Sequence, residues 1–271
     1  MDLKLKRGLL FLLGGLLVAC APLPRNPGAD DLAHMRILSG VMSGRTVLGG
    51  EVYMPGDALI PSGSSLRLRP GTIVYVQPAE STKIDPEYLS SATELLIRGT
   101  LWIDGTARHP VRFIPLSRSV AGEPAWAGIT LVDSVGSRID QARIEYAETA
   151  ILAIGSSPEI RGNQLRNNRY GIIAQQGSFP LISNNVVEHG EAGIFCWLGS
   201  SPQLIDNRVA DHVEEGIFID ASSRPLLQDN QVTGNDLGLV LYDRRLAGNL
   251  SGVSGNREDL RLLTPDREQS P

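Results

Sequence analysis

Four side chains in the second half of the chain have the chemistry to hold a metal ion. They are His189, Asp211, His212 and Glu214, and they fall in two charged segments, 188–191 and 211–215. Imidazole nitrogens and carboxylate oxygens bind zinc, copper and other divalent ions, and the same groups act as general acids and bases. The spacing contains no HExxH motif. The residues are a candidate divalent-metal site, with solvated charges on a turn as the alternative, and the sequence indicates no other cofactor.

Two aspartates offer a second kind of chemistry. Asp206 and Asp229 each directly precede an asparagine, in two consecutive segments of similar sequence. If the segments stack as parallel strands, the two carboxylates lie roughly 5 Å apart, the separation that retaining glycosidases use. This pair, or Asp220, would be catalytic in a polysaccharide lyase or glycoside hydrolase. A repeating chain also produces such a pair automatically.

Aromatic residues form a third group. Phe195, Trp197, Phe218 and Tyr242, with Asp220 among them, fall at outward positions of successive repeated segments. Aromatic faces beside a carboxylate suit sugar rings, and an exposed apolar face also suits a protein partner. The remaining interpretation is that the segment 243–255 lies over these aromatic residues and covers them. We predict a non-catalytic binding face for a polysaccharide or an envelope protein.

The elements that position these groups follow a repeat. Three residue types keep one register over four units: Pro158, Pro180, Pro202 and Pro225; Asn163, Asn185, Asn207 and Asn230; Gly171, Gly193, Gly216 and Gly238. The period is about 22 residues, which lies in the range of solenoid repeats, and one extra residue falls near 213–214. Apolar residues alternate within each unit, which is typical of short strands that stack coil on coil around one core. The pattern predicts an all-β protein, a single parallel β-helix of about eight to nine coils.

The repeated asparagines predict a ladder of side-chain amides that bond from one coil to the next. Cys196 falls in an inward column beside Ala174 and Ile219, so we expect a buried thiol.

The first half of the chain carries looser versions of the repeat. They are Pro70-Gly71-Thr72, Gly99-Thr100-Leu101, Trp126-Ala127-Gly128-Ile129 and Ile144-Glu145-Tyr146. This order resembles the right-handed parallel β-helix repeat proteins, the pectate-lyase-like and periplasmic copper-protein-like group. The resemblance implies a right-handed β-helix, and it adds copper handling as a further functional alternative. The Asn-Thr-Asp, Gly-His-Gly and Arg-Ile-Lys strings of polygalacturonase-like members are absent, so the binding interpretation is favoured over an enzyme.

The N-terminus predicts export. Lys4, Lys6 and Arg7 precede a short apolar run that ends Leu17-Val18-Ala19-Cys20, which resembles the bacterial lipoprotein box. We expect cleavage before Cys20, lipidation of its sulfur, and anchoring in the membrane. By the same resemblance Ala21, where an aspartate would favour the inner membrane, favours the outer membrane, with the body facing the periplasm or the surface.

These patterns divide the chain into four parts: a signal peptide at 1–19, a lipidated cysteine, linker and N-terminal cap at 20–46, the β-helix at 47–263 and a polar tail at 264–271. A projecting loop is expected at 77–92. The 25 basic and 30 acidic residues give a formal charge of −5 and argue against nucleic acid as a partner. The sequence therefore predicts an envelope lipoprotein whose β-helical body binds or scaffolds.

Overall fold

The computed structural model describes residues 26–79, 90–117, 123–248 and 250–264. The predicted signal peptide, Cys20 and the tail after residue 264 lie outside the described residues, as does most of the loop expected at 77–92. Within the described ranges the chain forms three parallel β-sheets, one short helix, α1 (Ala29–Ala33), and one 3-10 turn, η2 (Arg244–Ala247). No helix in these ranges has both the length and the apolar character needed to cross a membrane.

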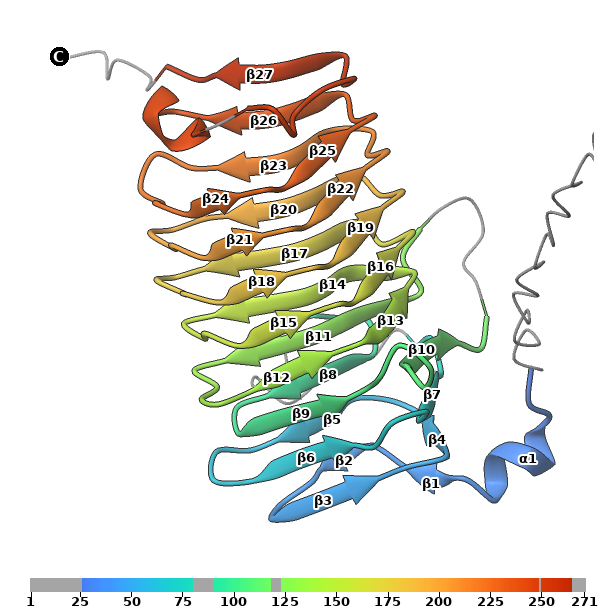
Figure 1. Cartoon of the computed structure of the whole chain (residues 1–271). Coiled ribbons are helices and arrows are strands. Elements are labelled where there is room, and N and C mark those ends of the chain that lie inside the picture. The colour runs from blue at the N-terminus through green and yellow to red at the C-terminus, as the bar shows by residue number, and fades with distance from the viewer. Residues whose placement is uncertain (1–25, 80–89, 118–122, 249, 265–271) are drawn as a thin grey trace, which may run out of the picture.

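The strands pile up as a rod in which each coil adds one strand to each sheet (Figure 1). Sheet A contains β1 (Arg36–Ile37), β4 (Glu51–Met54), β7 (Ile73–Val76), β10 (Val111–Pro115), β13 (Ala142–Glu145), β16 (Gln164–Arg166), β19 (Val186–Glu188), β22 (Arg208–Ala210) and β25 (Gln231–Thr233). Sheet B contains β2 (Gly40–Val41), β5 (Ala58–Ile60), β8 (Glu94–Ile97), β11 (Trp126–Val132), β14 (Ala147–Ile154), β17 (Tyr170–Gln175), β20 (Ala192–Cys196), β23 (Glu215–Ile219), β26 (Leu237–Leu241) and β27 (Glu258–Leu262). Sheet C contains β3 (Arg45–Leu48), β6 (Ser65–Leu68), β9 (Thr100–Asp104), β12 (Arg138–Asp140), β15 (Glu159–Arg161), β18 (Leu181–Ser183), β21 (Gln203–Ile205) and β24 (Leu226–Gln228). The predicted β-helix of about nine coils is confirmed.

The predicted register is confirmed in all three sheets. The stacked inward columns are Ile160, Ile182, Leu204 and Leu227 in sheet C, Leu165, Val187, Val209 and Val232 in sheet A, and Ile172, Ile194, Ile217 and Leu239 in sheet B. Nearly all of these side chains are fully buried in one continuous core. Strands of three to five residues cannot bury a face alone, so stacking supplies the stability of every coil.

Gly128 shows why one motif glycine is required. The pairing of β11 with β14 shifts by one residue after Gly128, whose φ is +109°. A Cβ atom there would lie 1.8 Å from the carbonyl oxygen of Thr149, so only glycine fits.

The first boundary predicted from the sequence is wrong, because the β-helix begins at Arg36 rather than at 47. Strands β1, β2 and the start of β3 already pair with the second coil, and Leu38 is fully buried. Residues 36–46 therefore form the first coil and not a cap. Their strands have two to four residues, which is too short for the alternation that marks a strand in sequence.

The last coil is incomplete, as predicted. Leu260 and Leu262 pair with Leu239 and Leu241 in sheet B, and Val253 bridges Val232. Sheet C has no described strand beyond β24, and η2 packs beside that edge instead. Charged side chains on and beside β27, which include Arg257, Glu258 and Arg261, discourage further strand addition at this end.

Candidate functional site

The asparagine ladder that the sequence predicted is present inside the corner between sheets C and A. The Oδ1 atom of each asparagine after Asn163 accepts two bonds from the asparagine one coil earlier, one from its backbone N–H and one from its Nδ2. The three Nδ2–Oδ1 distances are each 2.9 Å. These side chains satisfy buried backbone groups and one another, so their role is structural.

Two further ladders were missed. The first runs along the corner between sheets A and B through His212, Asn235 and Asn256, and Asn168, two coils earlier, bonds Ala147 and Ile144 in the same way. The second runs between sheets B and C through Ser134, Ser156, Ser178 and Ser200, in which each hydroxyl after the first accepts from a backbone N–H of the preceding coil. The sequence did contain a signal for the serines, because Ser156, Ser178, Ser200 and Ser223 each stand two residues before a repeat proline.

The candidate metal ligands do not all face the same side of the β-helix wall: some lie on its outer surface and one points into its interior. His189 and Asp211 stack on the outer surface, with His189 Nε2 4.0 Å from Asp211 Oδ2. His212 points inward, where its ring Nδ1 donates to Asn235 Oδ1 at 2.8 Å and occupies the place of a ladder asparagine. Burial lowers the pKa of His212 below its ordinary value. The extra residue of this coil, Val213, bulges into solvent beside Glu214.

The donors available in the described part of the chain do not fit a copper or zinc site. No group of three or more His, Cys, Asp or Glu side chains lies close enough together there to hold a metal ion. Cys196 is buried as predicted, and burial raises the pKa of its thiol well above the ordinary value, which disfavours the thiolate that metals bind. His212 already uses one ring nitrogen within its ladder.

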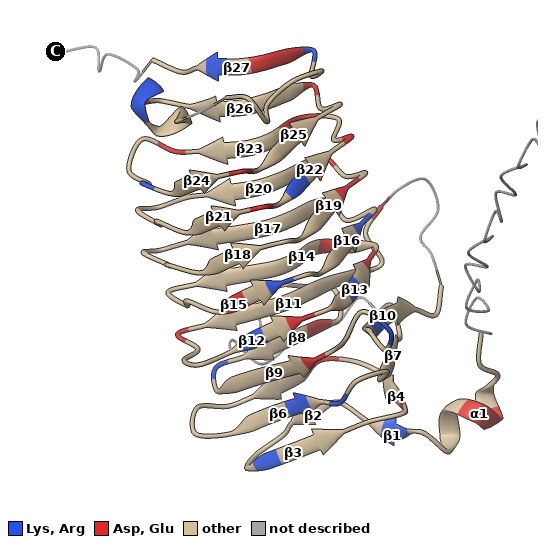
Figure 2. Cartoon of the chain, viewed as in Figure 1, with Lys and Arg blue, Asp and Glu red and all other residues tan. Residues whose placement is uncertain are grey.

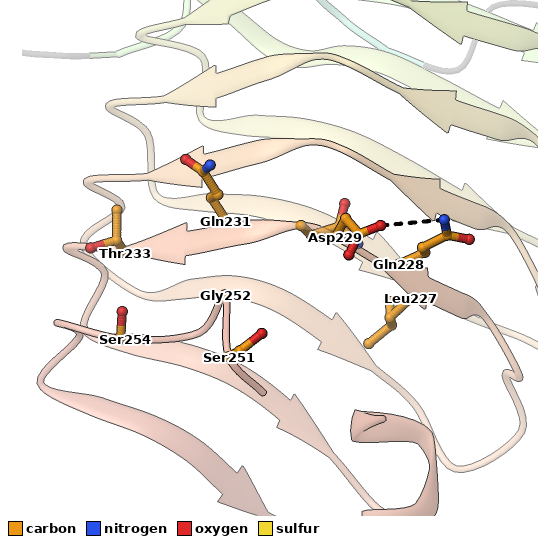
Figure 3. A pocket seen from close by; sticks show the side chains of 9 residues that line it. Leu227, Gln228, Asp229, Gln231, Thr233, Ser251, Gly252 and Ser254 are labelled. Atoms are coloured by element: carbon orange, nitrogen blue, oxygen red, sulfur yellow. Dashed lines mark hydrogen bonds between the residues drawn. The ribbon is translucent and has the colours of Figure 1, made fainter. Parts of the chain in front are cut away.

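Asp206 and Asp229 are neighbours in successive coils at the corner between sheets C and A. Both have a positive φ, 54° at Asp206 and 52° at Asp229, and both are exposed. Short polar side chains tolerate that left-handed backbone, so the turn itself explains the choice of aspartate. Asp229 also lines an open hollow of about 590 Å³ at the C-terminal coil, with Gln228, Ser251 and Ser254 (Figure 3). Its carboxylate accepts a hydrogen bond from Gln228 Nε2 at 3.3 Å.

The aromatic residues form a compact cluster on the outer face of sheet B. Phe195 and Phe218 occupy paired positions of β20 and β23, and their rings stack with centroids 5.1 Å apart. Trp197 stacks on Phe195 at 5.9 Å and lies 5.8 Å from Phe218, while Tyr170 meets Phe195 edge to face at 5.8 Å. We call these four residues, Tyr170, Phe195, Trp197 and Phe218, the aromatic platform.

The platform is open to solvent where Trp197 stands. Trp197 is 43% exposed, whereas Phe195 beneath its neighbours is 9% exposed. Leu198, the next residue, has φ +51° and is also exposed. A bulky residue in left-handed backbone is strained and needs support from its surroundings.

Asp220, predicted for this face, supplies that support through its carboxylate oxygens. Its carboxylate accepts from the backbone N–H groups of Leu198, Ser222 and Ser223 and from the Ser222 hydroxyl. Burial opposes its ionisation, but these hydrogen bonds outweigh burial and lower the pKa of Asp220. Asp220 therefore fixes the turn that carries Trp197.

Tyr242, the last residue predicted for this face, is half-buried and makes no ring contact with the other described aromatic residues. Tyr170, which the sequence prediction left out, belongs to the cluster instead. Its hydroxyl donates to Glu191 at 2.7 Å, and Glu191 also accepts from Arg169 at 2.8 Å. In sequence, Tyr170 stands two residues before the inward Ile172, so the alternation of the repeat gave no signal for an outward ring.

One comparison with known proteins bears on these coils. Residues 119–250 match the family model described as periplasmic copper-binding protein (NosD). No curated protein and no solved structure matches the chain. The matched span runs from before β11 to beyond η2 and contains the whole aromatic platform. The match covers just under half of the chain, so over this span the chain is similar to that periplasmic family, and the structure shows a parallel β-helix.

Proposed function

We propose that the protein is an envelope-located, non-catalytic binding module whose aromatic platform holds a polysaccharide. The observation that carries the proposal is Trp197, which stacks on Phe195 and remains 43% exposed on an outer sheet face. A ring that is fixed by its neighbours and still open offers contact area at little cost in conformational entropy.

The shape of the platform favours a sugar chain over a small soluble ligand. The rings lie on the outer face of a sheet, and none of the described surface hollows lies over them. An extended polymer can follow the column of outward side chains along the rod, with sugar C–H faces on the rings. Glu191, held by Tyr170 and Arg169, supplies carboxylate oxygens beside the platform for sugar hydroxyls.

The enzyme alternative has weaker support. Asp206 and Asp229 lie at the corner between sheets C and A, away from the platform on sheet B. Asp220 is saturated by hydrogen bonds from its own turn. A catalyst at Asp206 would release reducing ends or unsaturated sugars from a polymer, and the Asp206→Asn variant would lose that release.

Location belongs to the same proposal. The matched family is periplasmic, which agrees with an envelope protein. The sequence of residues 17–20 supports lipidation at Cys20, and Ala21 supports the outer membrane. Labelling of cells with a radioactive fatty acid tests the anchor, because a Cys20→Ser variant should take up no label.

The binding test uses the full chain on a glycan array. We expect binding to at least one polymer, weakened at least about tenfold in Trp197→Ala, because an exposed aromatic anchor commonly contributes that much. Phe218→Ala should weaken binding in the same direction. Val213→Ala is the matched control, since Val213 is an exposed apolar residue on a different corner of the rod.

Three results would overturn the proposal. They are the absence of glycan binding by the wild-type protein, affinity unchanged in Trp197→Ala, and an equal loss in Val213→Ala. Capture of one defined envelope protein through Trp197, without glycan binding, would replace the polysaccharide by a protein partner.

A further inference from the structure

A second surface, on sheet C near the N-terminal end of the rod, has a different character. Trp102 on β9 pairs with Arg67 on β6 and with Arg138 on β12, so the indole stands between two arginines on neighbouring strands. Arg45 on β3 pairs with Ser65 on β6, and both residues lie beside this group. These five residues line an open hollow of about 390 Å³, a size typical of small-ligand sites. Figure 2 shows the basic segments on β3, β6 and β12.

The side chains around Trp102 are held in place. Its indole N–H donates to the carbonyl oxygen of Gly136 at 3.1 Å, which fixes the ring. Asp104, two residues along β9, binds the guanidinium groups of both Arg67 and Arg138. One carboxylate therefore orients the two arginines that flank the indole, and its side chain is only 14% exposed.

The charge of the hollow is only partly neutralised. Three arginines line it and no acidic side chain does. Asp104 is shared by two of these guanidinium groups, and Asp140, which also contacts Arg138, is shared with an arginine outside the hollow. Arg45 is exposed and forms no ion pair with any described residue. In a chain of formal charge −5, this is a local positive region with a flat aromatic wall.

We propose that this hollow, here called the Arg–Trp hollow, binds a saccharide that carries a phosphate or sulfate ester. The sugar ring packs on the indole of Trp102, and the ester oxygens accept hydrogen bonds from Arg45, Arg67 and Arg138. Guanidinium groups bind such oxyanions through paired N–H donors. Three guanidinium groups match the three terminal oxygens of a phosphate or sulfate ester and exceed the two oxygens of a carboxylate. The site lies on sheet C, so it is separate from the aromatic platform on sheet B.

Calorimetric titration of the full chain tests the inference with four probes: glucose 1-phosphate, glucose 6-sulfate, glucuronate and glucose. We expect one or both esters to bind, glucuronate to bind more weakly and glucose not to bind. The preference between the two esters identifies the natural oxyanion. Affinity should fall as salt rises, because the exposed arginines are screened.

Variants assign the binding to the hollow. Arg45→Gln should weaken ester binding about tenfold, since a hydrogen bond to a charged group contributes on that order. Trp102→Leu should weaken ester binding while inorganic phosphate still binds, because only the ring contact is lost. Arg166→Gln is the matched control: Arg166 has a side chain of similar exposure on sheet A, paired with Glu188. Trp197→Ala should also leave ester affinity unchanged, which separates this site from the polysaccharide proposal.

The inference is overturned if neither ester binds at low salt, if glucose binds as well as the esters, or if Arg45→Gln has wild-type affinity. It is also overturned if Arg166→Gln loses as much affinity as Arg45→Gln. Circular dichroism of each variant checks that the fold is intact. Arg45 is exposed and forms no ion pair with a described residue, so Arg45→Gln is expected to disturb the fold least.

Discussion

Removal of one rung of the asparagine ladder tests the physical basis of the fold. Asn207 is 1% exposed, and its side chain makes three hydrogen bonds to groups of the preceding coil. Oδ1 accepts from the backbone N–H and the Nδ2 of Asn185, at 3.1 and 2.9 Å, and Nδ2 donates to the carbonyl oxygen of Ile182 at 2.8 Å. Asn207→Ala removes these three bonds and a fourth, from Asn207 Nδ2 to Asn230 Oδ1, in a place that water does not reach, while Asn185 Nδ2 keeps its bond to the carbonyl oxygen of Ile160.

The expected cost follows from that count. A hydrogen bond contributes about 1 kcal/mol and a buried group left without a partner costs about 1–3 kcal/mol, so the loss of four buried bonds predicts a loss of at least about 3 kcal/mol in the free energy of unfolding. The assay is urea unfolding of the full chain followed by far-ultraviolet circular dichroism, with tryptophan fluorescence as a second probe.

Asn230→Ala is the matched control. Asn230 makes the same three bonds as the last rung, to the backbone N–H and Nδ2 of Asn207 and to the carbonyl oxygen of Leu204. It also lines the open hollow of about 590 Å³ at the C-terminal coil, so water can replace the lost oxygen and nitrogen. We expect a loss of about 1–2 kcal/mol there. Equal losses in the two variants, or a loss below about 1 kcal/mol in Asn207→Ala, would refute the claim that the buried ladder bonds hold the coils together.

Two further predictions concern buried titratable groups. Burial lowers the pKa of His212, so the unfolded chain binds this proton more readily than the folded chain. The stability contributed by neutral His212 should be complete above its unfolded value near pH 6.5 and should fall as pH drops below it, by at most about 1.4 kcal/mol per pH unit. His212→Asn, which restores the ladder asparagine, should flatten urea-unfolding midpoints between pH 7 and 5, and an unchanged slope would contradict this account. Burial likewise raises the pKa of Cys196, so iodoacetamide at pH 8 should alkylate the peptide that contains Cys196 far faster in urea than in the native protein. Equal rates by mass spectrometry would show that the thiol is accessible.

The repeat in the amino-acid sequence was sufficient to predict how the chain winds. Proline, asparagine and glycine recur with one shared period because each coil must repeat the same turns, and stacking places identical columns in contact. The asparagine ladder, the buried Cys196, the bulge at Val213 and the incomplete last coil all followed from that period. The first coil escaped detection because β1 and β2 have only two residues each.

Which surface groups are available for chemistry depends on contacts that form only in the folded chain. A column in the sequence shows which residues are neighbours, but it does not show which of their donors and acceptors are already used. His212 lies in an outer turn by sequence, yet its ring enters the core as a substitute for asparagine. Asp220 lies between the aromatic residues, yet its oxygens hold a strained turn.

The Arg–Trp hollow is a second case in which the sequence period did not predict which side chains lie together. Arg45, Arg67, Trp102 and Arg138 lie in consecutive coils of unequal length, so no fixed period in the sequence aligns them. Strand pairing alone brings them to one face. The repeat thus sets the backbone path, while the position and freedom of each functional side chain depend on hydrogen bonds and pairings between coils that only the folded chain contains.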